Sequence, residues 1–160
     1  MSKIYIPLLR ISIGFVFLWA FFDKLLGLGF GTLSERAWIV GGSPTTGYLK
    51  NATEGPFANL FQSLAGNPLI DYLFMFGLLG VGLAFVLGIS LRFASVAGAT
   101  MMVLMYLSAA PPENNPLVDE HIIYALVLLI LAELKAGEQI GFSRQWSKSK
   151  VAKLLPFLRN

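Results

Sequence analysis

Four long apolar runs constrain the fold of this chain more than any other feature of its sequence. They extend over about residues 4–27, 71–89, 92–110 and 117–136. A helix needs about 20 consecutive, mostly apolar residues to cross the hydrocarbon core of a bilayer. The chain is therefore predicted to be an all-α integral membrane protein in which four transmembrane helices form an antiparallel bundle.

Composition supports this class and excludes several others. Of the 160 residues, 56% are hydrophobic and 13% are charged, which is more apolar than soluble domains usually are. The chain has no cysteine, so disulfides, iron–sulfur clusters and cysteine-ligated zinc are excluded. Its length favours a single membrane domain, residues 1–160, without room for a classical nucleotide-binding fold. Arg10 interrupts the first run and no cleavage signal follows, which favours a retained first helix over a signal peptide.

Two cations interrupt the first apolar run. Arg10 and Lys24 lie on the same face of a helix, whereas Asp23 points elsewhere. Burying either cation against lipid would cost roughly 2.5 to 3.5 kcal/mol, so this face should turn toward other helices, water or a ligand. Two roles remain open for each cation: a structural one, with the side chain extending to the lipid head groups, and direct contact with a ligand.

Basic residues predict the orientation in the membrane. With both termini in the cytoplasm, the inner side carries a net charge of +7 and the outer side −4. The positive-inside rule favours this arrangement, in the plasma membrane of the cell. No basic groove with interleaved aromatic residues is present, so lipid and not nucleic acid is the expected partner. The inner set is Lys3, Arg10, Arg92, Lys135, Arg144, Lys148, Lys150, Lys153 and Arg159, and the outer set is Lys24, Arg36 and Lys50.

Two further segments lie outside the spans. Residues 28–70 are rich in glycine, proline and aromatic residues, which predicts an outer cap of short helices, at 34–40, where Ser34 would cap the helix, and at 56–65. Residues 142–160 mix apolar and basic residues, as in an amphipathic segment that lies on the inner leaflet. Docking of a cytoplasmic partner is the alternative for this tail.

Small residues predict where helices approach closely. Gly80, Ala84 and Gly88 are spaced four apart in the second span, and Ala94 and Gly98 in the third. This spacing lets the backbones of membrane helices come close together. Such faces would also permit association between copies of the chain.

The cap contains a polar turn at residues 41–47. Ser43 and Thr45 offer hydroxyls beside glycine-rich backbone, which is the chemistry of an anion-binding nest. An ordinary turn uses the same residue types. Both interpretations therefore stay open.

A second polar group precedes the fourth span. Glu120, His121 and Tyr124 can share one patch at the mouth of the bundle, next to Asp119. A histidine beside carboxylates can transfer protons near neutral pH, but it can also serve only as a hydrogen-bonded cap. With one histidine and no cysteine, a metal or bis-histidine haem site is not expected. Glu133 is expected to form a structural charge pair with Arg10.

With these features placed, the chain resembles the DoxX/DoxD family of small four-helix membrane proteins. The resemblance rests on the order and spacing of three stretches, Arg10 to Leu25, Trp38 to Thr45 and Asn114 to Tyr124. The most similar branch, DoxD, implies oxidation of thiosulfate to tetrathionate with transfer of electrons to membrane quinone. It also implies a second subunit of the DoxA kind.

The resemblance gives the polar residues candidate roles. Thiosulfate would bind Lys24, Arg36, Ser43 and Thr45; quinone would bind Phe21, Trp38 and Tyr124; and Asp119, Glu120 and His121 would be the catalytic proton relay. Quinone is the expected electron acceptor, and no metal, haem or flavin is expected in this chain. The alternative is a non-enzymatic scaffold or small-solute carrier of the same family.

Overall fold

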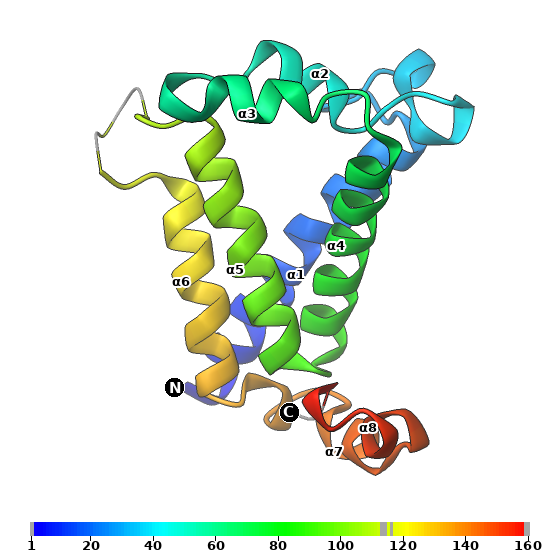
Figure 1. The fold of residues 1–160 in the computed structure, drawn as a ribbon. Helices are drawn as coiled ribbons and strands as arrows, with labels where there is room; N and C mark the ends of the chain where they lie inside the picture. The colour runs from blue at the N-terminus through cyan, green and yellow to red at the C-terminus, as the bar shows by residue number, and fades with distance from the viewer. Residues whose placement is uncertain (1, 113–114, 116, 159–160) are drawn as a thin grey trace.

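The structure is a computed structural model that describes residues 2–112, 115 and 117–158 of the chain, with no side-chain description for Ser2 and Lys3. The described residues form helices and connecting turns and no strand, which confirms the all-α class for this part of the chain (Figure 1). The long helices are α1 (Ser2–Leu26), α4 (Pro68–Leu87), α5 (Leu91–Ser108) and α6 (Glu120–Glu133). Asn114 and Pro116, which precede the predicted fourth span, and Arg159 and Asn160 of the tail lie outside the described residues.

Within the described part of the chain, three helices are long and apolar enough to cross a membrane. They are α4, α5 and residues Ile4–Leu26 of α1. The predicted fourth span is shorter than expected, because α6 has 14 residues and is only about 21 Å long at 1.5 Å per residue. At its start the Asn115 carboxamide accepts hydrogen bonds from Leu117 and Val118, which makes a turn in place of a helix. At its end Lys135 has a φ of 48°, which stops the helix.

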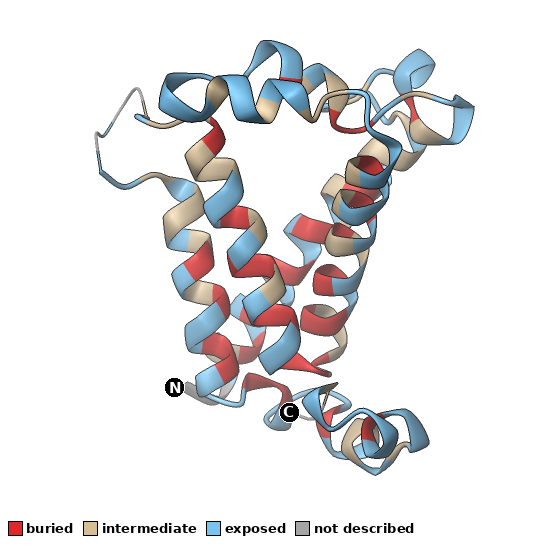
Figure 2. Ribbon diagram, viewed as in Figure 1, coloured by how far each residue is buried: buried red, intermediate tan, exposed pale blue. Residues whose placement is uncertain are grey.

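The four long helices form two pairs that diverge from one end of the molecule. α1 packs along α4, and α5 packs along α6. A tight turn through Gly88 and Ser90 joins α4 to α5, so the pairs are close together at this end, the turn end. They separate toward the opposite end, the cap end, where α2 (Thr46–Asn51) and α3 (Ala58–Ser63) cross between them (Figure 1). Buried residues lie on the helix faces that turn toward one another (Figure 2).

Close packing within the α1–α4 pair depends on glycines other than the predicted Gly80. A Cβ on Gly82 would lie 2.7 Å from Cγ of Leu18 and 2.9 Å from its backbone nitrogen. A Cβ on Gly14 would lie 2.8 Å from the backbone nitrogen of Val86. No atom lies within 4 Å of a Cβ on Gly80, so its predicted packing role is wrong, because this face of α4 turns away from α1. Gly98 does pack closely, since a Cβ on it would lie 2.9 Å from Cδ1 of Leu128 in α6.

Gly82→Val is expected to lower the free energy of unfolding by about 1 to 3 kcal/mol, because the added methyl groups overlap α1. Gly80→Val is the matched control, since it makes the same change of residue type on the same helix in open space. Unfolding in mixed micelles by increasing fractions of sodium dodecyl sulfate measures both. Equal losses for the two variants would show that Gly82 has no special packing role.

The cap and the tail differ in detail from their predicted forms. Residues 34–40 form two 3-10 turns, η1 (Ser34–Arg36) and η2 (Trp38–Val40), and Ser34 is not a cap. Residues 56–65 contain η3 (Gly55–Phe57) and α3. The tail contains η4 (Ala136–Glu138), α7 (Ser143–Lys148), α8 (Lys150–Leu154) and η5 (Pro156–Leu158). It lies at the turn end, where Trp146 Nε1 donates to the carbonyl of Leu158 at 2.7 Å.

Candidate functional site

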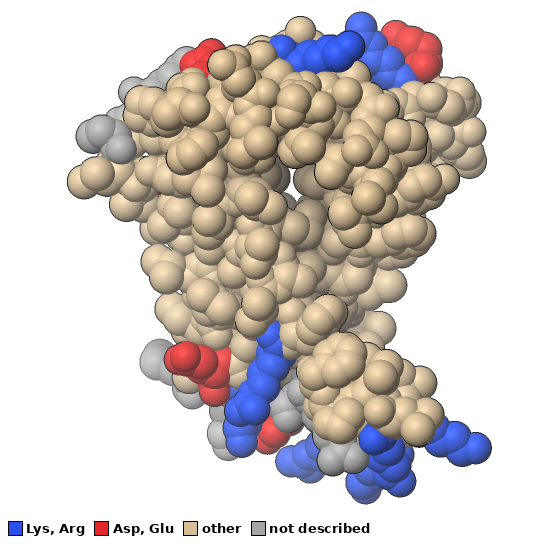
Figure 3. Space-filling view, viewed as in Figure 1, with Lys and Arg blue, Asp and Glu red and all other residues tan. Residues whose placement is uncertain are grey.

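A cavity of about 330 Å³ lies at the cap end, where the helix pairs diverge. All but four of its lining residues are apolar. Figure 3 shows a narrow gap in the surface below α2 and α3, as expected where the helices separate. The lining residues are Lys24 of α1; Pro44, Thr45, Tyr48 and Leu49 of the polar turn and α2; Phe61 and Leu64 near α3; Ile70, Leu73 and Phe74 of α4; and Met101, Leu104, Met105 and Ser108 of α5.

Lys24 is the single charged residue among those that line the cavity. It lies in the last turn of α1 and is partly buried. Its Nζ is 5.9 Å from the ring centroid of Phe74, which is within the range of a cation–π contact. Among the described residues, no hydrogen-bond or ion-pair acceptor lies within reach of this ammonium. Lys24 therefore borders the cavity with hydrogen-bond donors to offer.

The neighbouring Asp23 does not neutralise Lys24 through an ion pair. The Asp23 side chain is buried and accepts hydrogen bonds from the backbone N–H groups of Phe30 at 3.1 Å and Gly31 at 2.9 Å. These bonds hold the segment after α1 against the end of the helix. Asp23 thus has a structural partner of its own.

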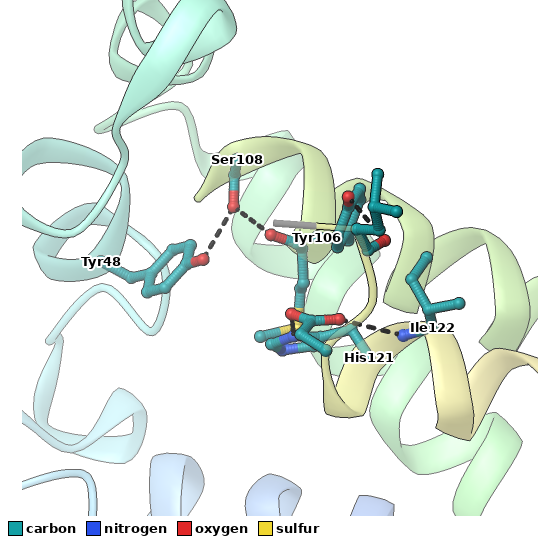
Figure 4. Close-up of polar contacts among 8 residues, drawn as sticks. Tyr48, Tyr106, Ser108, His121 and Ile122 are labelled. Carbon is teal, nitrogen blue, oxygen red and sulfur yellow. Dashed lines mark hydrogen bonds and ion pairs between the residues drawn. The ribbon is translucent and has the colours of Figure 1, made fainter. Parts of the chain in front are cut away.

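Tyr48 of α2 and Ser108 of α5 meet across the cavity. Their hydroxyl oxygens are 2.7 Å apart, and Ser108 Oγ also donates to the carbonyl of Met105 at 2.7 Å (Figure 4). Because Ser108 has only one hydroxyl proton, Tyr48 is the donor in the bond between them. The backbone N–H of Glu54 donates to the carbonyl of Ser108 at 2.9 Å. The sequence analysis did not identify Tyr48 or Ser108.

The predicted anion-binding turn does bind an anion, but that anion is part of the chain. Oδ1 of Asp71 in α4 accepts hydrogen bonds from Ser43 Oγ at 2.9 Å, from the Thr45 N–H at 3.2 Å and from Thr45 Oγ1 at 2.5 Å. The donors assigned to thiosulfate are therefore already occupied. In this structure Ser43 and Thr45, which were predicted to bind substrate, attach the cap to α4.

Asp71→Ala is expected to lower the free energy of unfolding by about 2 kcal/mol, because buried donors lose a charged acceptor. Amide hydrogen exchange in residues 43–51 should accelerate, since this segment loses its attachment to α4. Glu54→Ala is the control, because it removes an exposed carboxylate from the same cap. Unchanged exchange in the Asp71 variant would contradict the structural role of this cluster.

The residues predicted as a proton relay lie together at the start of α6. Asp119 precedes the helix and caps it, because its Oδ1 accepts from the N–H of Ile122 at 3.2 Å. Its Oδ2 is 2.7 Å from Nδ1 of His121 (Figure 4). Glu120 is exposed. Ligand atoms of these three residues lie within 4.8 Å of one another, but Asp119 and His121 already bond to each other.

The Asp119 carboxyl precedes α6 and lies outside the three candidate spans. Burial of this carboxyl raises its pKa. The hydrogen bonds from His121 and from the backbone of Ile122 lower the pKa by more than burial raises it, so it lies below its ordinary value. The Asp119 carboxyl and the His121 ring are thus held in contact at the start of α6. None of the three predicted relay residues lines the cavity.

The aromatic residues predicted to bind quinone are not gathered at one site. Trp38 contacts Tyr72 edge to face, with ring centroids 5.3 Å apart, and Phe21 is buried in the core. Tyr124 packs against that core from α6. None of them lines the cavity, whose lining comes from α1, α2, α4 and α5 and from residues near α3. Arg36 is exposed and also lies outside the cavity lining.

The predicted charge pair between Arg10 and Glu133 is absent. The Arg10 guanidinium is 1% exposed and donates to the carbonyls of Phe85, Val86 and Ile140, the last two at 3.1 and 2.5 Å. Glu133 is exposed. The carbonyls at the end of α4 have no partners within that helix, so they are available acceptors. Arg10 therefore caps α4 and attaches it to the segment after α6.

Comparisons of the chain with protein-family models, with curated proteins and with solved structures found no match.

Proposed function

We propose that this chain is a multi-pass protein of the plasma membrane that binds a membrane quinone in the cavity and reduces it with electrons from thiosulfate. The observation that supports this is the cavity itself, whose apolar walls end at the ammonium donors of Lys24. A quinone is an apolar ring with carbonyl acceptors at its two ends. Small-ligand sites combine such apolar walls with a few polar groups that fix orientation.

The proposal includes the orientation in the membrane. α1, α4, α5 and α6 form four membrane helices, of which α6 is the shortest. The two ends of the chain lie at the turn end of the molecule in Figure 1, as an even number of crossings requires. The tail carries exposed Arg144, Lys148, Lys150 and Lys153, so this end is assigned to the cytoplasm.

The reaction balances between the two substrates. Two thiosulfate dianions lose one electron each and join through a new sulfur–sulfur bond, which yields tetrathionate. The quinone takes up these two electrons and two protons and leaves as the quinol. Lys24 would hold a quinone oxygen through a hydrogen bond, and the His121 cluster would supply protons from the cap end.

A second subunit of the DoxA kind completes the thiosulfate site in this proposal. The donors of Ser43 and Thr45 are occupied by Asp71, and Arg36 is exposed on the cap. A dianion needs cations that converge on it, and among the described residues the cavity wall supplies only Lys24. A partner docked on the cap would add the missing charge.

Quinone reduction by the purified chain in lipid vesicles tests this function, with thiosulfate added and with or without a DoxA-like subunit. We expect thiosulfate-dependent turnover that falls at least about tenfold in His121→Ala, which is the lower end of general acid–base effects. Glu133→Gln, an exposed carboxylate at the other end of α6, should keep its activity. A folded chain that binds quinone but shows no turnover with either arrangement would contradict the oxidoreductase activity.

The second candidate is a non-enzymatic scaffold or carrier. It is favoured by the Asp71 cluster, because an acidic side chain fills the turn that an anionic substrate would otherwise occupy. A scaffold should bind its partner equally well with or without quinone, and a carrier should move its solute across vesicles without electron transfer.

A further inference from the structure

The cavity wall reaches the membrane-facing side of the molecule. Leu73 of α4 and Leu104 of α5 both line the cavity and are still 62% and 48% exposed. A side chain that lines a cavity and is also exposed lies at its opening. Both residues belong to candidate membrane spans, so this opening lies at the depth of the bilayer.

The surface around Leu73 and Leu104 is apolar. Tyr72 and Phe76 on α4 and Val103 on α5 are exposed. Exposed apolar side chains on membrane helices face lipid chains. The opening between Leu73 and Leu104, called here the lateral mouth, therefore leads to lipid.

The opposite side of the cavity is closed toward water. Tyr48, Leu49 and Phe61 line the cavity from the cap. Two sets of bonds hold this cover in place: Thr45 is bound to Asp71 of α4, and Tyr48 is bound to Ser108 of α5. The cap thus joins both diverging helix pairs over the cavity.

From this geometry, and resting on the proposed function, we propose that the ligand enters sideways from the bilayer through the lateral mouth. Its ring lies under the cap with an acceptor oxygen toward Lys24, and its hydrocarbon tail leaves between Leu73 and Leu104. Lys24 presents unengaged donors, so the ligand must carry an acceptor at the ring end. Within the proposed function, the ligand class is a tailed quinone dissolved in lipid, because the cap covers the side of the cavity away from the lateral mouth.

Site-directed blocking tests this route, because a chain without cysteine can be labelled at one chosen position. Leu104→Cys is reacted in detergent with a bulky maleimide and returned to lipid vesicles. Val96→Cys is the matched control, since residue 96 is 60% exposed on the same helix and does not line the cavity. Leu60→Cys places the same label on the exposed side of the cap.

The probe is a decyl-tailed azidoquinone dissolved in the vesicles, and the readout is the rate of its saturable photo-attachment to the protein. We expect the label at residue 104 to slow attachment at least about tenfold, as expected when a preformed site loses its access route. Labels at residues 96 and 60 should change the rate less than about twofold. Saturable attachment that is slowed only by the label at residue 60 would overturn lateral entry and favour entry through the cap.

The outcomes separate the two proposals, because this assay contains no thiosulfate and requires no turnover. Saturable attachment that is independent of the label at residue 104 would overturn the entry route and leave the quinone site in place. Absence of saturable attachment to the unlabelled, folded protein would overturn the quinone site and with it the route.

Discussion

Lys24→Met should lower the rate of quinone reduction about 10- to 100-fold without unfolding the protein. A hydrogen bond from a charged donor contributes about 1.5 to 3 kcal/mol, and each 1.4 kcal/mol corresponds to a factor of ten. Methionine keeps the apolar stem that packs near Phe74 but removes the ammonium. The chain gains an apolar group at the cavity, so its free energy of unfolding should not fall. Initial rates in vesicles and unfolding in mixed micelles measure the two effects.

Two comparisons complete the Lys24 experiment. Lys50→Met is the control, because Lys50 is exposed in the last turn of α2 and does not line the cavity. Lys24→Arg keeps the charge and should retain part of the activity. If Lys24→Met and Lys50→Met had the same rate as the unchanged protein, the ammonium would have no part in holding the quinone.

Arg10→Met should cause the largest loss of stability, about 3 kcal/mol or more. Three carbonyls would lose their donor, and each unsatisfied buried acceptor costs about 1 to 3 kcal/mol. The loss should appear as unfolding at a lower fraction of sodium dodecyl sulfate. Arg10→Lys should be intermediate, because an ammonium keeps the charge but cannot reach acceptors in three directions with a planar fork.

Arg92→Met is the matched control for the Arg10 variants. Arg92 lies at the same end of the molecule, in the first turn of α5, and its side chain is exposed. Its replacement should change the unfolding free energy by less than about 0.5 kcal/mol. A similar loss in both arginine variants would mean that removal of charge from this end causes the effect, and not loss of the hydrogen bonds from Arg10 to the end of α4.

The sequence predicted where polar residues lie on their helices better than it predicted which groups they bind. It placed Arg10 and Lys24 on one helix face because helical periodicity is local. It could not predict that Arg10 would bind the end of α4, since that contact depends on where α4 stops at Gly88 and how the segment near Ile140 returns to it. An opposite charge, Glu133, was the natural but wrong partner.

The cavity could not be predicted for a related reason. It exists because α4 and α5 diverge from a short turn, and divergence of helices leaves no periodic signal in the sequence. Asp71 was a visible clue, as a carboxylate in the first turn of an apolar helix. A carboxylate in the first turn of a helix also stabilises the helix dipole without any other partner. The bonds of Asp71 to Ser43 and Thr45 could therefore be recognised only from the structure. Tyr48 was hidden in a cap segment that had no predicted helix.

The boundaries of α6 show how local chemistry overrides an apolar pattern. The run 117–136 was long enough for a span, but the Asn115 turn and the Asp119 cap start the helix at Glu120. Side chains of asparagine and aspartate compete with helical hydrogen bonds in this way. The same cap holds His121 in place, so the short helix and the position of the candidate proton relay have one cause.

The most direct test of the quinone site is equilibrium binding of a short-tailed quinone to two tryptophan variants in lipid. Met105→Trp fills the cavity, whereas Val96→Trp adds the same ring at an exposed position that does not line it. The quinone site predicts at least about tenfold weaker binding for Met105→Trp, equal to 1.4 kcal/mol, and unchanged binding for Val96→Trp. Equal affinity of both variants and the unchanged protein would contradict binding of quinone in this cavity.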